Sequence, residues 1–329
     1  MIILLKWGEF PDRRKQMAHM VETMAYAGEL PWHGLGKEVH NDLTPDQMLV
    51  EAGLDWEVEK IPAFANVNGK QVAVGRSALV RSSDHKILDV ISDDWNPMQN
   101  RDAFEFFNDF VMAGDMEMHT AGSLRGGQLV WGLAKIKESF ELFGGDKVDG
   151  YLLFTNPHLY GKSIDVRFTP IRVVCNNTLT LAVNSKVDNM VKVSHRREFD
   201  ASQVKETLGI AKEKLDKYKG MAAFLGTKRY TGDNVVEYFK TVFPLLTAKE
   251  DSKKLMSKNA SLALDIINTQ PGAEFAEGSW WQAFNTVTYM TDHLIGRSAD
   301  NRLTSAWYGS NKNLKTKALE TAVEFAEAA

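Results

Sequence analysis

Short apolar stretches separated by turn-forming residues run through the chain between about residues 56 and 195, and this pattern predicts β-strands. The clearest pair is Met116–Arg125 with Gln128–Ile136, because Gly126-Gly127 between them can take the positive φ angles of a tight hairpin turn. A second pair, Gly150–Thr155 with Ser163–Phe168, encloses Asn156-Pro157-His158. Turns at Asn68-Gly69 and Ser82-Ser83-Asp84 separate three further strands, Trp56–Lys60, Gln71–Arg81 and Lys86–Ser92. A last strand is predicted at Met190–His195.

Other segments repeat apolar residues at three- and four-residue intervals, the spacing of an amphipathic helix. Thr44-Pro45 supplies an N-cap and a first-turn proline for a short helix that ends near Gly53. Asn100 is expected to cap a helix through Met112. Thr169-Pro170 begins a further predicted helix, although its β-branched residues favour a strand. From Asp200 onward helical spacing dominates, through Leu225 and in Gly232–Phe243, Ser252–Ile267, Trp280–Ile295 and Lys312–Ala328.

These elements predict an α+β fold: an antiparallel, β-hairpin-rich sheet with packed helices, followed by a helical C-terminal third. The expected organisation is an N-terminal extension or arm at 1–30, a β-rich core at 31–199 and a helical region at 200–329. The 329 residues suffice for one large core or two smaller ones. No apolar run approaches the roughly 20 residues of a membrane span, and one cysteine excludes an internal disulfide. A cytoplasmic protein without a membrane segment is therefore expected.

Charge is distributed unevenly along the chain, whose formal net charge is −4. Residues 162–229 hold 14 Lys and Arg against 7 Asp and Glu, whereas the segments on both sides are acidic. A cationic middle between acidic flanks is the arrangement of a local polyanion site, and it also fits a solvated helix face.

Nucleic-acid binding needs cations that follow the phosphates and planar groups that stack on bases. Lys192, His195 and Arg196-Arg197 form a compact basic cluster after a predicted strand. Asn176 and Asn177 offer amides that either complete a structural network or meet a ligand. The candidate nucleic-acid-binding residues are Lys162, Arg167, Arg172, Asn176, Asn177, Lys186, Lys192, His195, Arg196, Arg197, Lys228 and Arg229.

Signals for catalysis are weak. Cys175 lies on an apolar stripe, which favours packing, although Arg172 one turn earlier would lower the pKa of an exposed thiol. The eight histidines show no metal-binding spacing. Asp93-Asp94 and Asp115/Glu117 would hold Mg²⁺ only if the fold brought them together. Neither a catalytic residue, a cofactor nor a metal site is predicted, and an enzyme is the less favoured class.

The tryptophans divide between core and surface. Trp131 alternates with Val130 and Gly132 on a hairpin strand and is expected in the core. Trp280 and Trp281 are adjacent, so one of them should face outward from its helix. Together with Phe284 they are the candidate oligomer interface.

Seven segments follow one another along the chain: PWHGLG, WNPMQNRDAFEFFNDFV, AGSLRGGQLVWGLAKI, YLLFTNPH, TPIRVVCNNTL, VSHRR and WWQAFNTVTYMTDH. In this order they resemble the phage/plasmid-like protein family, a domain of unknown function, from about Met17 to the end. Thr169–Leu179 is the most specific part, and residues 1–16 are expected to be an extension. The resemblance implies a cytoplasmic protein of a bacterial host cell, in a mobile-element setting. It also implies a distant, fold-level likeness to phage single-strand annealing proteins.

Three functions are compatible with these observations. The favoured one is a homo-oligomeric protein that binds or anneals single-stranded DNA, or binds RNA, in phage recombination or replication. The first alternative is an interaction module for phage or host replication and recombination proteins. The second alternative is a Mg²⁺-dependent, nuclease-like enzyme.

Overall fold

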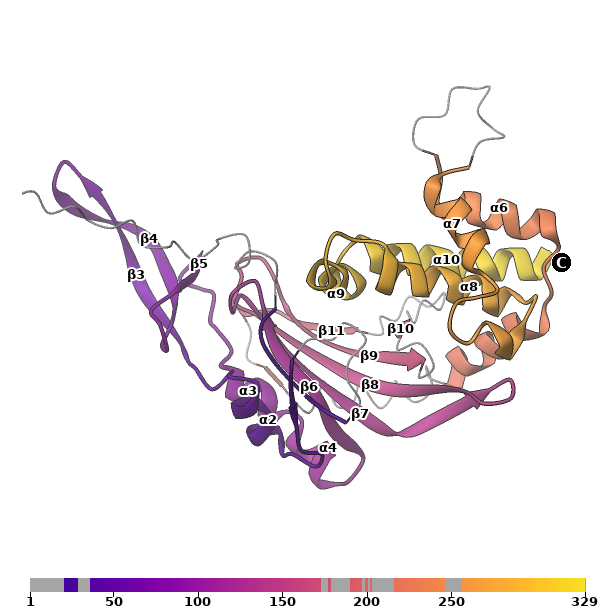
Figure 1. The fold of residues 1–329 in the computed structure, drawn as a ribbon. Coiled ribbons are helices and arrows are strands. Elements are labelled where there is room, and N and C mark those ends of the chain that lie inside the picture. Colours follow the sequence, from indigo (N-terminus) through magenta and orange to yellow (C-terminus); the bar gives the residue numbers. More distant parts are fainter. Residues whose placement is uncertain are drawn as a thin grey trace, which may run out of the picture.

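A large, mostly antiparallel sheet forms the centre of the computed structural model, which describes residues 21–28, 36–172, 177–178, 190–196, 199–200, 202, 216–245 and 256–328. Its strand order is β10-β9-β8-β7-β6-β1-β2, with β11 also paired to β9 (Figure 1). Only β1 and β2 pair in parallel within these residues. The strands are β1 Val21–Ala27, β2 Lys37–Val39, β6 Met116–Leu124, β7 Leu129–Leu142, β8 Asp146–Pro157, β9 Ile164–Arg172, β10 Asn177–Thr178 and β11 Met190–Val193.

Both faces of this sheet are covered, because its central strands carry apolar residues on both sides. Leu152 and Phe154 of β8 pack toward the short helices α2 Pro45–Glu51, α3 Asn100–Glu105 and α4 Asn108–Met112. Leu153 and its neighbour Trp131 on β7 pack on the opposite side, against Trp307. Trp307 belongs to α9 Ala299–Tyr308, which lies across that face (Figure 1). The core position predicted for Trp131 is confirmed, since this side chain is fully buried.

The C-terminal part is helical, as predicted. Its helices include α6 Gly232–Val242, α7 Lys258–Ile266, α8 Trp280–Tyr289 and α10 Ser310–Ala328, and residues 216–227 are also helical. A five-residue π-helix, η3 Met290–Leu294, continues α8. These elements bury one apolar cluster together with the far ends of β7, β8 and β9. No helix in the described part of the chain is long and apolar enough to cross a membrane.

A smaller three-stranded sheet projects from one end of the molecule (Figure 1). It consists of β3 Val58–Val67, β4 Lys70–Arg81 and β5 Ile87–Ile91. The predicted Asn68-Gly69 turn is confirmed: both residues have positive φ angles, 53° and 80°, and they join β3 to β4. The Gly126-Gly127 turn is confirmed as well, between β6 and β7, with φ angles of 67° and 89°.

The helix predicted from Thr169 is wrong. Thr169–Arg172 complete β9 and pair antiparallel with Val148–Tyr151 of β8. Because β8 reaches back to Asp146, a partner strand was present for the whole of this segment, and the β-branched Thr169 and Ile171 fit a strand. Residues 21–27, placed by the sequence in a separate N-terminal segment, also lie in the sheet, as β1 between β6 and β2.

The helix predicted from Asn100 to Met112 is two helices, α3 and α4, with a break at Phe106-Phe107. Asn100 does not cap it, since Gln99 occupies the N-cap. The buried Asn100 amide instead donates to the carbonyl oxygen of Leu54 at 3.0 Å, and its Oδ1 lies 2.9 Å from Nε2 of His158. Asn100 therefore links a loop, a helix and the end of β8.

Candidate nucleic-acid interface

A cationic pocket of about 400 Å³ lies beside β9 and β11 on the face of the sheet covered by α9. Its charged lining comes from five separate parts of the chain: the β6–β7 turn, the β8–β9 loop, β9, β11 and the start of α10. It contains five cations and one carboxylate, namely Arg125, Lys162, Arg167, Lys192, Lys312 and Asp165. An excess of positive charge in a concave site attracts anions, although the chain as a whole is acidic.

Arg167 is held in one position at the base of this charge cluster. Its Nε and Nη2 donate to the two carboxylate oxygens of Asp165, both at 2.7 Å. Its Nη1 donates to the carbonyl oxygen of Trp307 at 2.7 Å, and the guanidinium lies 5.0 Å from the centre of the Tyr308 ring. These bonds use three of the five N–H groups of a guanidinium. Arg167 thus ties β9 to α9 and keeps donors for a ligand.

Two aromatic residues form the α9 side of the pocket. Tyr308 OH lies 2.6 Å from Oγ1 of Thr155, and burial raises the pKa of Tyr308 above its usual range, so the phenol is neutral. Trp307 is 6% exposed and packs edge-on against Trp131. Its indole N–H has no hydrogen-bond partner among the described residues.

Lys162 and Lys192, like Arg125, provide accessible charge in the pocket. Both side chains are exposed, and no carboxylate of the described residues is ion-paired with either of them. Lys192 sits opposite Asp165 in the β11–β9 register, and Lys162 lies in the loop just before β9. Since Asp165 is bound by Arg167, its carboxylate does not neutralise either lysine.

Three of the residues predicted from the sequence, Lys162, Arg167 and Lys192, are therefore brought together in this pocket. Arg125 and Lys312 were missed. Arg125 precedes the Gly126-Gly127 turn and Lys312 lies near the start of a helix. Neither position carries a local pattern that points to a ligand, so only the tertiary fold identifies them.

Other predicted cations lie elsewhere. Arg196 is exposed and pairs with Asp94 at 2.7 Å, outside the pocket. Arg229 belongs to the helical region, where its Nη1 donates to the carbonyl oxygen of Glu277 and its backbone forms an isolated bridge with Ser279. The Lys228 ammonium lies 5.6 Å from the centre of the Phe224 ring. These three residues do not join the pocket.

His195 is not a phosphate-binding cation, contrary to the prediction. It is 3% exposed and stacks on Trp95 with ring centres 4.0 Å apart. Burial lowers its pKa to about 4, against the opposing effect of its bond to the carbonyl oxygen of Asn96. His195 is therefore neutral at pH 7 and acts in packing.

The remaining candidates are only partly described. Arg172 ends β9 and Asn177 begins β10, where the two residues pair with each other through the backbone. Asn176, Lys186 and Arg197 lie outside the described residues, as does Cys175.

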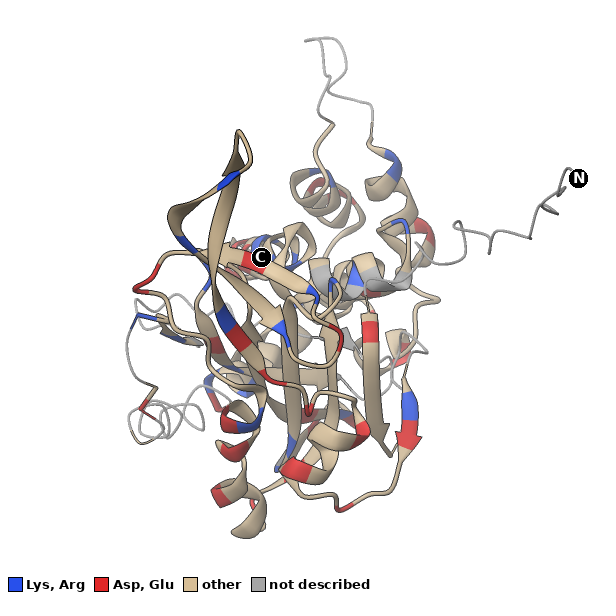
Figure 2. Cartoon of the chain, turned by 90° about the vertical axis from the view of Figure 1, so that its left-hand side faces the viewer, with Lys and Arg blue, Asp and Glu red and all other residues tan. Residues whose placement is uncertain are grey.

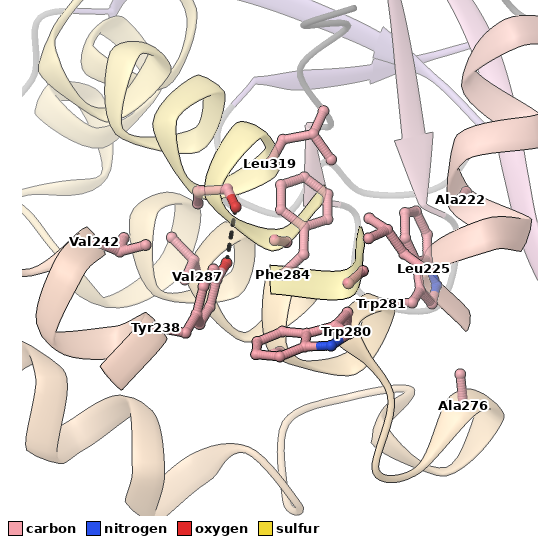
Figure 3. Close-up of a cluster of buried hydrophobic side chains, with 14 of the residues drawn as sticks. Ala222, Leu225, Tyr238, Val242, Ala276, Trp280, Trp281, Phe284, Val287 and Leu319 are labelled. Atoms are coloured by element: carbon pink, nitrogen blue, oxygen red, sulfur yellow. Dashed lines mark hydrogen bonds between the residues drawn. The ribbon is translucent and has the colours of Figure 1, made fainter. Parts of the chain in front are cut away.

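The predicted oligomer interface is wrong. Trp280, Trp281 and Phe284 are all fully buried within the chain, in the cluster drawn in Figure 3. Trp281 also donates from Nε1 to Oδ2 of the buried Asp146 at 2.9 Å. Helix α8 is enclosed on every side, so adjacent tryptophans can both be internal.

The acidic residues considered for Mg²⁺ do not assemble into a site. Asp93 accepts from the hydroxyl of Ser77 at 3.1 Å, and Asp94 pairs with Arg196. Among the described residues, no group of three or more His, Cys, Asp or Glu side chains is placed to hold a metal ion.

Two buried histidines, His158 and His195, and the partly buried His119 should make the protein less stable in mild acid. Burial lowers the pKa of His158 to about 3 and that of His119 and His195 to about 4, each from 6.5. Below pH 6.5 the unfolded chain binds protons that the folded chain does not, so stability falls as pH falls. We expect a loss of about 2 kcal/mol per histidine between pH 6.5 and pH 5.

Urea unfolding at a series of pH values measures this loss. His158→Gln should remove about one third of the pH dependence, whereas the same change at the exposed His85 should remove none. A stability that is constant from pH 7 to pH 5 would contradict the neutral, buried state of these rings.

Comparison with known proteins assigns a family. The family model of a domain of unknown function, DUF932, matches residues 87–307, which include most of the cationic pocket. No curated protein and no solved structure matches the chain. The fold-level likeness to single-strand annealing proteins therefore stays a prediction. Since the family model spans most of the 329 residues, the chain belongs to the DUF932 family.

Proposed function

We propose that this protein binds the phosphate backbone of single-stranded nucleic acid in the cationic pocket. The observation that carries the proposal is the convergence of Arg125, Lys162, Lys192 and Lys312 around the fixed Arg167. These residues come from strands, loops and a helix that are far apart in the sequence. If their charge served only to solvate a helix face, they would not need to converge on one pocket. Neutralisation of phosphates by Lys and Arg supplies most of the non-specific affinity for a nucleic acid.

The dimensions of the pocket favour a flexible single strand over a duplex. A volume of about 400 Å³ is that of a site for a small molecule or nucleotide. A single strand can insert one phosphate and its sugar there, whereas the grooves of a duplex need an exposed convex element to read them. The setting in phage or plasmid recombination rests on the sequence resemblance alone and belongs to the same proposal.

The double substitution Lys162→Ala/Lys192→Ala tests the site. On single strands each lost phosphate contact lowers the slope of log affinity against log salt by about 0.7, so the slope should fall by about 1.4. At about 0.1 M salt this corresponds to a roughly 25-fold weaker affinity. Fluorescence anisotropy with a labelled single-stranded oligonucleotide over a salt series measures both quantities.

Lys219→Ala/Lys258→Ala is the matched control, because both lysines are exposed and lie outside the pocket. It removes the same charge and should leave the slope unchanged. If the pocket variant keeps the affinity and slope of the unmodified protein, the pocket is not the site. If a free mononucleotide binds as tightly as the oligonucleotide, the ligand is a small phosphate compound and not a polymer.

A further inference from the structure

The hairpin of β3 and β4 forms an arm, residues 60–76, that extends away from the rest of the molecule (Figure 1). None of its side chains from Ile61 to Arg76 is buried. Five large apolar side chains on it are 42–58% exposed: Ile61, Phe64, Val67, Val72 and Val74. Scattered exposed apolar residues are ordinary, but a concentration on a single projecting element indicates a contact surface.

The strand register places three of these residues on one face of the arm. Ala65 pairs with Val72 and Val67 pairs with Lys70, and directly paired residues point to the same side of a hairpin. Val74 follows Val72 by two residues and shares that side. Val67, Val72 and Val74 therefore form a continuous valine face, with Lys70 beside it.

The backbone of the arm is also open to pairing. β5 pairs only with Ser77–Val80 of β4, so the rest of β4 has β3 as its sole neighbour in the described sheet. β3 is itself an edge strand. An open edge with apolar side chains is a surface on which another chain can dock. The arm also carries three cations and no carboxylate, the cations being Lys60, Lys70 and Arg76.

A surface of the opposite charge, also with exposed apolar residues, lies on the helices that pack below the large sheet. Residues 42–57 and 102–117 contain ten Asp and Glu and neither Lys nor Arg, and two of these acids pair with neighbouring cations, Asp46 with Arg101 and Glu51 with Lys37. They include α2, most of α3 and α4; α2 packs on α3, and both α2 and α4 pack on β6. Exposed apolar side chains stand among these acids, with Val50 48% and Met112 86% exposed. Figure 2 shows acidic bands on the helices at the bottom of the view and basic bands along the hairpin above.

We propose that the arm of one molecule docks on this acidic face of a second copy of the same chain. Both surfaces combine exposed apolar residues with opposite charge, which is the complementarity of a specific interface. In both views the arm points away from the acidic helices of its own molecule (Figures 1 and 2). Because the two surfaces differ, the contact is head-to-tail, and its repetition generates a ring or a filament and not a symmetric dimer.

Two variants each remove one side of this contact. Val72→Glu/Val74→Glu places acid on the valine face, and Glu105→Lys/Met112→Lys places base on the acidic face. All four residues are exposed, so both variants should melt as the unmodified protein does. Ile87→Glu/Val90→Glu is the matched control, since these residues of β5 are 61% and 46% exposed and lie outside the arm.

Sedimentation velocity over a micromolar concentration series, without nucleic acid, distinguishes the outcomes. The unmodified protein and the control should assemble beyond a dimer, and each interface variant alone should be monomeric, with at least a tenfold weaker association. Mixing the two variants should give a one-to-one dimer and nothing larger, because one intact arm and one intact face remain. A monomeric unmodified protein, an arm variant that still assembles, or a mixture that stays monomeric would overturn the proposal.

Discussion

Replacing Trp281 with alanine should destabilise the protein by about 4–5 kcal/mol or more, enough to unfold the C-terminal helices. The side chain is fully buried and contacts Tyr218 and Phe284, with ring centres 6.2 and 5.7 Å away. Its removal creates a large cavity and also takes a hydrogen-bond donor from the buried Asp146. The Asp146 carboxylate would then add a desolvation cost of about 1–3 kcal/mol to that of the cavity.

Trp281→Phe separates these two contributions, because it removes the N–H as the alanine variant does but keeps an aromatic ring that fills part of the cavity. The phenylalanine variant should lose less free energy of unfolding than the alanine variant. The difference between the two losses reports the cost of the larger cavity. Urea unfolding monitored by circular dichroism gives both free energies. A Trp281→Ala protein that remains folded and loses less than about 1 kcal/mol would place this side chain at the surface after all.

Helix α8 differs from the prediction because a single buried stripe is a property of helices at the surface, and α8 is not at the surface. In α8 the polar residues are buried too, and three of them donate to carbonyl oxygens of their own helix. Thr286 donates to the carbonyl oxygen of Gln282 at 2.9 Å and Asn285 to that of Trp281 at 2.8 Å. Because these buried residues are polar, a count of apolar positions does not identify α8 as a fully enclosed helix.

The cationic pocket was predictable in part. Arg167 and Lys192 could be found because both belong to one basic segment. Lys162 lies in the loop before β9, which begins at Ile164, so the alternation of side chains along the strand does not separate it from Arg167. Arg125 and Lys312 depend on the packing of α9 and α10 over the sheet, which no local pattern specifies.

The hairpin turns were the most secure predictions, and the β-branched segment after Thr169 the least. Gly126-Gly127 and Asn68-Gly69 determine a turn through their own backbone preferences. The local sequence Thr169-Pro170 favours a helix start just as strongly. Long-range pairing with β8 outweighed that preference, as is usual where a neighbouring strand is available.

Removing the charge of Lys315 should cost about 3–5 kcal/mol, because it leaves a buried carboxylate without its cation. Lys315 on α10 donates from Nζ to Oδ1 of Asp292 on η3 at 2.9 Å, and the two side chains are 1% and 0% exposed. Burial lowers the pKa of Lys315 despite the neighbouring carboxylate, which shows how strongly this site disfavours an isolated charge.

Lys315→Met is the test, and adding Asp292→Leu should recover much of the lost stability, since an apolar pair replaces an ionic one at little net cost. Urea unfolding of both single variants and the double variant gives the coupling energy. Single variants that each lose less than about 1 kcal/mol would mean that the pair is hydrated.

The Lys315–Asp292 pair also affects the position of Lys312 in the proposed site. One residue before Lys312 of the pocket, Asn311 donates to the carbonyl oxygen of Thr291 at 2.6 Å. Because η3 thus anchors the start of α10 through Asn311 as well as Lys315, Lys315→Met should weaken oligonucleotide binding at temperatures below global unfolding, and the double variant should restore it.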